Sequence, residues 1–324
     1  MQTIGSPLMW SLFAAFVLVA LLVDFFAMSK QGAHRVSTRE AAIWSLIWVA
    51  VSFVFMGWMW WYLGGASSDE AARATAQAKS LEYLTGYLIE KALAVDNIFV
   101  FMSVFALFGV PEPLRKRALV IGIIGAIVLR TVMILAGALL IQRFHGLLYV
   151  FGAFLVLVGA RSLMRGTREH DFSRNPILGL LHWRIPFVTH FDGERLFTTH
   201  NGIRAATPLL LAVVMIGVTD VIFAVDSIPA ILVVTHDPFV VVTSNLFAIM
   251  GLRAIYFLLA GLADRFRLLG TGLAFVMIFI GMKMLLDGIV RIPIAASLGV
   301  IGAIVAIAVA ASWLAPPARE PDAG

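Results

Sequence analysis

Two stretches share one pattern, Glu90-Lys91-Ala92-Leu93-Ala94-Val95-Asp96-Asn97 and Asp220-Val221-Ile222-Phe223-Ala224-Val225-Asp226-Ser227. Each begins with an acid and ends in Ala-Val-Asp followed by a small residue with a side-chain oxygen. Both stretches lie inside long apolar runs of the chain. Because acidic side chains are costly in hydrocarbon, we interpret the two matched pairs as one site assembled from two halves of the molecule.

The composition indicates a membrane protein. Of the 324 residues, 61% are hydrophobic and 13% charged, and the mean hydropathy is +0.95, whereas soluble domains average about 25% charged residues. Segments of about 20 apolar residues recur, and each could cross a hydrocarbon core of roughly 30 Å. We therefore expect an all-α, polytopic bundle of about nine transmembrane spans, at 8–28, 42–63, 83–108, 118–141, 146–164, 206–234, 239–262, 268–286 and 294–314.

The basic residues between the spans predict the orientation. Sixteen Lys and Arg residues fall in the segments on one side of the membrane and only four in the segments on the other. Cytoplasmic loops carry the excess of positive charge. The N-terminus is therefore expected outside and the C-terminus in the cytoplasm.

The similarity between the two halves continues beyond the acidic stretches. The segment that ends in Arg130 resembles the one that ends in Arg253, and Gly159-Ala160-Arg161 resembles Gly281-Met282-Lys283. Spans 3–5 and 6–8 are thus predicted to be two three-helix repeats. An odd number of helices inverts the second repeat across the bilayer, which is the architecture of many secondary transporters.

These features divide the chain into six parts. We expect two N-terminal helices in 1–64, the first repeat in 65–164, a basic cytoplasmic linker in 165–205, the second repeat in 206–290, a ninth helix in 291–315 and a disordered tail in 316–324. The linker should contain a β-hairpin, because Asn201-Gly202 suits a tight type I′ turn.

The two stretches supply six candidate metal ligands: Glu90, Asp96, Asn97, Asp220, Asp226 and Ser227. On a straight helix two acids six residues apart lie about 120° and 9 Å apart, too far to share one ion. Two arrangements remain possible. Either the first acid of each stretch binds the ion together with the residue seven positions later, which lies on the same helix face, or the helix breaks between the two acids. Pro229 favours a break in the second stretch, since its ring clashes with the carbonyl of Val225.

Carboxylate, amide and hydroxyl oxygens suit Mg²⁺, Ca²⁺ or Mn²⁺ better than Zn²⁺ or Cu⁺. Cysteine is absent, which excludes disulfides and thiolate sites, and the seven histidines fall in loops or at span ends. The sequence contains no phosphate-binding loop, so it gives no indication that the protein uses ATP directly. The expected partners are a metal-ion substrate and membrane lipid, with no prosthetic group and no nucleic acid.

Four basic residues lie within or near spans: Lys91, Arg130, Arg253 and Lys283. They can neutralise the acids as buried ion pairs and fix helix register. Alternatively, they hold the empty site when the metal leaves, or carry a coupled proton. Lys91 points about 100° away from Glu90 and need not pair with it, and Lys283 can extend its ammonium towards the membrane surface.

With these residues the chain resembles the TerC family of integral membrane proteins, most closely its Alx-type branch. The resemblance rests on the two acidic stretches, on Thr219–Ala230 around the second, and on Gly193–Phe197 and Ala206–Leu209 before it. It implies metal transport across the inner membrane, manganese export as the activity, an older association with tellurite resistance, and cation binding by the acids of both stretches. Ala94 stands where family members often have serine, so that position offers no hydroxyl.

The favoured function is export of a divalent cation, most readily Mn²⁺, by alternating access of the two repeats, without enzymatic activity. One alternative is an intramembrane aspartyl enzyme in which Asp96 and Asp226 share a proton. Another is a membrane scaffold or assembly factor for tellurite resistance, with charges used only for helix registry. Metal selectivity, the coupling ion, stoichiometry and protein partners stay open at this point.

Overall fold

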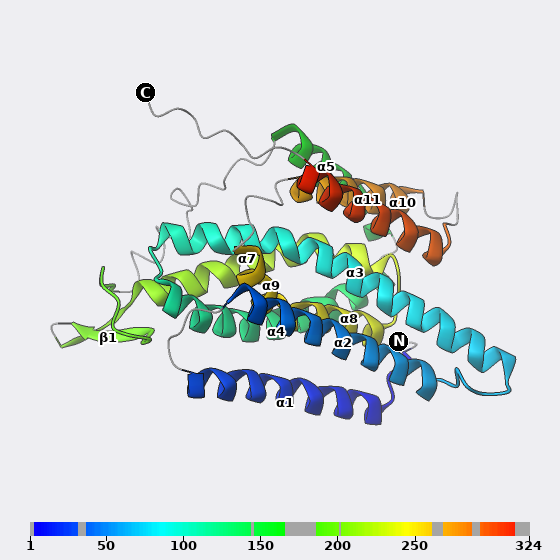
Figure 1. Cartoon of the computed structure of the whole chain (residues 1–324). Coiled ribbons are helices and arrows are strands. Elements are labelled where there is room, and N and C mark those ends of the chain that lie inside the picture. Colours follow the sequence, from blue (N-terminus) through cyan, green and yellow to red (C-terminus); the bar gives the residue numbers. More distant parts are fainter. Residues whose placement is uncertain are drawn as a thin grey trace.

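The computed structural model describes residues 3–31, 37–143, 146–165, 186–200, 202–260, 268–286 and 292–314. Within these ranges the chain is almost entirely helical (Figure 1). The helices are α1 (Pro7–Gln31), α2 (Thr38–Tyr62), α3 (Glu70–Leu107), α4 (Glu112–Arg143), α5 (Gly146–Arg165), α7 (Pro208–Leu232), α8 (Pro238–Met250), α9 (Leu252–Ala260), α10 (Leu269–Leu285) and α11 (Ile294–Leu314).

Several helices begin where the sequence provides a cap. The side chains of Ser37, Asp69 and Asp237 accept hydrogen bonds from backbone amides in the first turns of α2, α3 and α8. Pro208 and Pro238 occupy the first turns of α7 and α8, where a missing N–H costs nothing.

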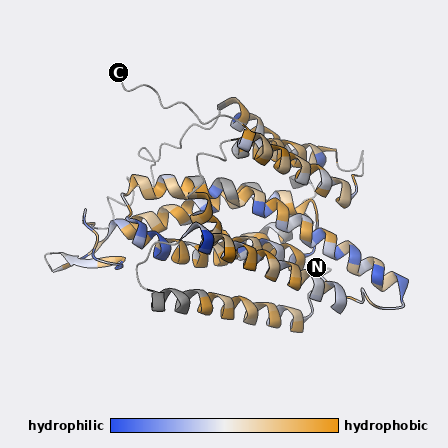
Figure 2. Ribbon diagram, viewed as in Figure 1, coloured by the Kyte–Doolittle hydropathy of each residue, from blue (hydrophilic) through white to orange (hydrophobic). Residues whose placement is uncertain are grey.

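In the described ranges, five segments are helical, long and apolar enough to cross a membrane: Thr38–Tyr62, Glu112–Gly137, Pro208–Leu232, Pro238–Ala260 and Ile294–Leu314. Three shorter apolar helical segments lie in α1, α5 and α10. Figure 2 shows mostly apolar ribbon over the helices, with polar colour at the outer end of α3 and at the hairpin. The chain is thus a helical membrane protein, while the count of nine crossings stays a prediction.

Of the two alternatives for the acidic stretches, a helix break between Asp220 and Asp226 of α7 is wrong. This helix continues through Pro229 to Leu232. Pro229 falls in the last turn, where only one carbonyl loses its amide partner. The chain breaks instead in the next span, where Gly251 separates α8 from α9.

Helix α8 lies at the centre of the bundle. All 13 of its residues are buried, and it contacts α2, α3, α4 and α9. Towards its N-terminal end, aromatic rings from four helices meet, with centroids 4.8–6.3 Å apart: Phe13 of α1, Phe55 of α2, Tyr83 of α3, and Phe239 and Phe247 of α8. This core holds α8 against the first three helices.

Helices α5 and α10 approach each other closely, on the side of the bundle opposite α1 (Figure 1). A Cβ added at Gly281 would lie 2.7 Å from the carbonyl oxygen of Gly152, and one added at Gly159 would lie 2.8 Å from that of Ala274. The contact positions rise in α5 as they fall in α10, so the two helices run antiparallel. Small residues permit this approach, as in many membrane helix pairs.

The hairpin expected in the linker is confirmed. Strands β1 (Phe197–His200) and β2 (Ile203–Ala206) pair antiparallel, with His200 opposite Ile203. Gly202 has a φ of 76°, which glycine adopts readily. Arg117 at the start of α4 donates to Glu194 at 2.6 Å, so the hairpin segment lies beside that end of the bundle. Most of the linker (166–185) and the tail (315–324) lie outside the described residues.

Candidate cation site

The largest fully buried side chain in the described structure is that of Arg130 on α4, which is 1% exposed and carries a guanidinium. It binds both first acids of the repeated stretches. Nη1 donates to Oε1 of Glu90 on α3. Nη2 donates to Oδ1 of Asp220 on α7 at 2.8 Å, and Nε lies 3.2 and 3.3 Å from the two oxygens of that carboxylate. The two stretches therefore meet at one cation.

Two neutral polar side chains complete this cluster. The hydroxyl of Ser227 lies 3.4 Å from Nη1 of Arg130. On α8, Nδ2 of Asn245 donates to Oε2 of Glu90 at 2.9 Å. Glu90, Asp220, Ser227 and Asn245 are all buried. The cluster thus contains side chains from α3, α4, α7 and α8. Among these helices, α3 packs most extensively against α8, and α4 against α7.

One atom of the cluster is unsatisfied. Oδ1 of Asn245 is buried and accepts no hydrogen bond from any residue that the structure describes. Rotating the amide would not help, because the oxygen would then face the carboxylate of Glu90, which has no proton to donate when ionised. Leaving a buried acceptor without a donor costs about 1–3 kcal/mol.

The charges of the cluster do not cancel when both carboxylates are ionised. Two negative groups then surround one guanidinium, which leaves a net charge of −1. Arginine does not lose its proton in proteins, so Arg130 cannot be the carrier of a coupled proton. In the structure it binds both carboxylates, which agrees with the ion-pair interpretation and with that of a cation resting in the empty site.

The remaining predicted ligands are only partly described. Asn97 is buried on α3, one residue after Asp96. Asp96 and Asp226 have helical backbone in α3 and α7, but their side chains lie outside the described residues. The described residues include no group of three or more His, Asp or Glu side chains placed to hold a metal. Of the predicted ligands, Glu90 and Asp220 are the ones whose described carboxylates bind the same cation.

Two of the other predicted basic residues bind groups outside this cluster. Nζ of Lys91 donates to the carbonyl of Ala248 at 3.2 Å and lies 5.6 Å from the ring centre of Tyr87. This ammonium therefore binds the C-terminal end of α8, next to the break at Gly251. Lys283 of α10 donates to Ser297 of α11 at 2.8 Å. Arg253 is partly exposed on α9.

A second polar cluster, which the sequence did not predict, lies where α7 connects to α8. Nζ of Lys79 is 2.8 Å from Glu82 and 3.9 Å from Asp237. Thr235 donates to Glu82 at 2.5 Å, and Thr3 of the N-terminal segment donates to Asp237 at 2.8 Å. The short connection Thr235–Pro238 could have indicated a tightly held turn, but its hydrogen-bond partner Glu82 on α3 lies 153 positions earlier in the chain.

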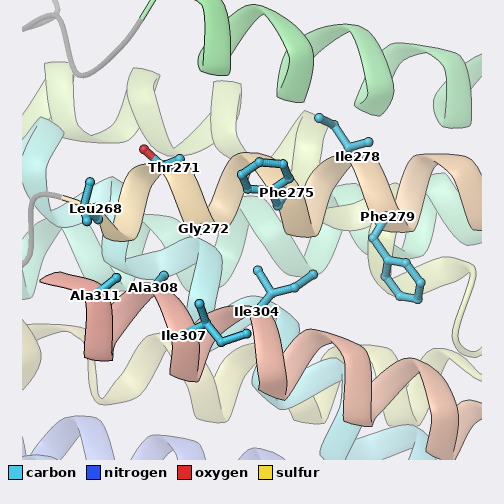
Figure 3. A pocket seen from close by; sticks show the side chains of 10 residues that line it. All are labelled: Leu268, Thr271, Gly272, Phe275, Ile278, Phe279, Ile304, Ile307, Ala308 and Ala311. Carbon is cyan, nitrogen blue, oxygen red and sulfur yellow. The ribbon is translucent and has the colours of Figure 1, made fainter.

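A groove between α10 and α11 has no chemistry for a cation. It has a volume of about 480 Å³. The side chain of Thr271 contributes its one side-chain oxygen (Figure 3), and the other residues that line it are Leu268, Gly272, Phe275, Ile278, Phe279, Ile304, Ile307, Ala308 and Ala311. Phe275 and Ile307 are exposed, as is usual for side chains that face lipid.

Comparison with known proteins gives one family. Residues 75–320 match the model of the integral membrane protein TerC family. This range includes both acidic stretches, Arg130 and Asn245. No solved structure matches the chain.

Similar proteins cover nearly the whole chain. A protein of Salmonella typhi named "Putative membrane-bound redox modulator Alx" is 48% identical over 307 residues, which is 95% of this chain and 94% of that protein. Its namesake in Escherichia coli strain K12 is 47% identical over 315 residues, 97% of each chain. An uncharacterized membrane protein of Myxococcus xanthus, STKORF319, is 40% identical over 312 residues, 96% of this chain and 94% of that protein.

Proposed function

Because the chain belongs to the TerC family of integral membrane proteins, we propose that it carries a divalent metal cation across the inner membrane and out of the cell. The expected substrate is Mn²⁺. The observation behind this proposal is that Glu90 and Asp220, equivalent acids of two repeated stretches, bind a single buried positive charge.

The cluster has the chemistry of a cation site. Two carboxylates supply negative charge, and Ser227 and Asn245 add hydroxyl and amide oxygens beside them. These are hard ligands, which suit Mn²⁺, Mg²⁺ and Ca²⁺. Asp96 and Asp226 are the further carboxylates that we expect to join the site when the metal is bound.

Arg130 serves in this proposal as a tethered competitor for the site. Its guanidinium offsets one of the two carboxylate charges while no metal is present, so the two buried acids do not face each other alone. An arriving dication displaces it, and the guanidinium returns when the metal leaves. This exchange gives the buried acids a partner at every stage.

Alternating access of inverted repeats is the proposed route. Two observations support it. Helix α3 contacts α8, and in the same way α7 contacts α4. Within each pair the helices run parallel, because the positions in contact increase along both helices. The contacts are Glu90 with Asn245, Lys91 with Ala248, Gly122 with Ile216 and Arg130 with Asp220. The third helices of the two repeats, α5 and α10, run antiparallel. Pairings of this kind are expected from two units related by a two-fold axis in the membrane plane.

Two other functions deserve comparison with this one. Redox modulation is the activity in the name of the Alx relatives. This chain has no cysteine, so it cannot carry out thiol chemistry with its own side chains. A scaffold role is favoured by the ion pairs of Arg130, which could serve helix registry alone. Under that role Asp226→Asn would leave metal content unchanged and alter the recovery of partner proteins.

The test is the manganese content of cells under manganese stress. Cells with the wild-type protein should hold less Mn than cells without it, and Glu90→Gln, Asp220→Asn, Asp96→Ala and Asp226→Ala should restore accumulation. Glu70→Gln is the matched control, since Glu70 is an exposed acid at the start of the same helix α3, and it should export as the wild type does. Equal Mn content in all strains would remove the export proposal.

A further inference from the structure

We propose that Asn245 is a direct ligand of the transported cation, through its amide oxygen Oδ1. This inference rests on the proposed function and adds to it a neutral ligand from α8, outside both repeated acidic stretches. It follows from an atom that the metal-free cluster leaves unused.

The orientation of the amide is determined by its neighbour. Nδ2 of Asn245 donates to Oε2 of Glu90 at 2.9 Å, and the same carboxylate accepts from Arg130 through its other oxygen. Oδ1 is bonded to the same amide carbon as this nitrogen. It therefore lies beside the carboxylate of Glu90, buried and without a donor among the described residues.

The guanidinium of Arg130 does not donate a hydrogen bond to this oxygen in the described structure. Arg130 directs its nitrogens to Glu90, Asp220 and Ser227, and none of its described hydrogen bonds goes to Asn245. A metal ion differs from a guanidinium because it gathers six or more oxygens around one point. Oδ1 of Asn245 accepts no hydrogen bond when arginine occupies the site, and it lies beside the carboxylates. It can therefore supply one of the additional oxygen ligands that a metal ion requires.

The helix that carries this oxygen is tightly packed. Every residue of α8 is buried, and a Cβ added at Gly86 of α3 would lie 2.8 Å from Oγ of Ser244, the residue before Asn245. Helices α3 and α8 are thus in close contact next to the site. A ligand on a rigid, buried helix helps to select a cation by size, because the oxygen cannot move to suit a different radius.

The neutrality of the amide also matters for transport. An additional carboxylate at this point would bind a dication more tightly, and would increase repulsion among the acids once the metal leaves. An amide adds a ligand without adding charge. The inference therefore predicts opposite effects for two small substitutions at the same residue.

The experiment measures Mn²⁺ binding to the purified full-length protein in detergent, by calorimetric titration with MnCl₂. Asn245→Ala, which removes the oxygen, should weaken binding about tenfold or more. Asn245→Asp, which keeps an oxygen at the same place and removes the donor to Glu90, should bind Mn²⁺ at least as tightly as the wild type. If Asn245 only orients Glu90 through Nδ2, both variants lose affinity together, and that result would overturn the inference.

Two further variants separate this inference from the proposed function. Thr243→Val is the matched control on α8, because the buried hydroxyl of Thr243 bonds only to the backbone of its own helix in the described structure, and wild-type binding is expected. Glu90→Gln tests the site itself. Loss of binding in Glu90→Gln with wild-type binding in Asn245→Ala would sink only the ligand role of Asn245, whereas wild-type binding in Glu90→Gln would count against the cation site as a whole. Should Asn245→Ala fail to fold, the affinity of Asn245→Asp still decides the point.

Discussion

Arg130 is stabilised by two carboxylates from different helices, and each of them depends on it in return. Removing one member of a buried ion cluster leaves a charge without compensation, which typically costs about 3–5 kcal/mol. In this cluster the removal of the arginine would leave Glu90 and Asp220 close together with no positive charge between them. A dication could take over that function.

Arg130→Gln should therefore lower the melting temperature of the metal-free protein, and added Mn²⁺ should raise it by more than in the wild type. The measurement is thermal unfolding in detergent with and without MnCl₂. Arg117→Gln on the same helix removes an exposed ion pair with Glu194 and should cost less than about 1 kcal/mol. A variant at Arg130 that melts like the wild type and responds no more strongly to Mn²⁺ would rule out competition between arginine and metal.

The sequence predicted part of this cluster for a clear reason. Glu90, Asp220 and Ser227 belong to a repeated pattern, and repetition distinguishes a site from scattered polar residues. Asn245 has no acid beside it in the chain, and its link to Glu90 spans 155 positions. A pairing of that kind depends on the packing of α3 against α8, which the local sequence does not reveal.

At the scale of helices, the existence and order of most elements followed from apolar length, but the place of the break did not. Pro229, two residues after the second stretch, was the strongest local breaker of this span, and α7 passes through it near its end. Gly251 breaks the following span instead. There the ammonium of Lys91 takes the carbonyl of Ala248 near the end of α8, and a cation near a helix C-terminus is favourable. The partner that stabilises the break lies on another helix.

The close contact between α5 and α10 gives a prediction about stability. Gly281→Ala places a methyl group 2.7 Å from a backbone oxygen of the facing helix, so the helices must separate, at a cost of about 1–3 kcal/mol. Gly299→Ala on α11 meets nothing within 4 Å, and should be neutral or slightly stabilising because alanine is the better helix former. Chemical unfolding of both variants in detergent makes the comparison. Equal stability would mean that the two helices do not pack this closely.

At the scale of the whole molecule, the predicted orientation can be tested directly because the chain has no cysteine of its own. A single Ser68→Cys, in the exposed connection before α3, should react in intact cells with a thiol reagent that cannot cross the inner membrane. A single Thr199→Cys, exposed on β1, should react only after the membrane is opened. The reverse pattern would invert the topology and contradict the rule of positive charge inside.

The length of α3 has a mechanical consequence. This helix has 38 residues, so it is about 57 Å long, and its first residue, Glu70, lies about 30 Å along the axis from Glu90. A tilt of α3 by about 10° about the point where Glu90 meets Arg130 would swing its outer tip by about 5 Å. A spin label at position 70, paired with one on the loop after α7, would report a tilt of this size on addition of MnCl₂ as a change in the distance between the labels.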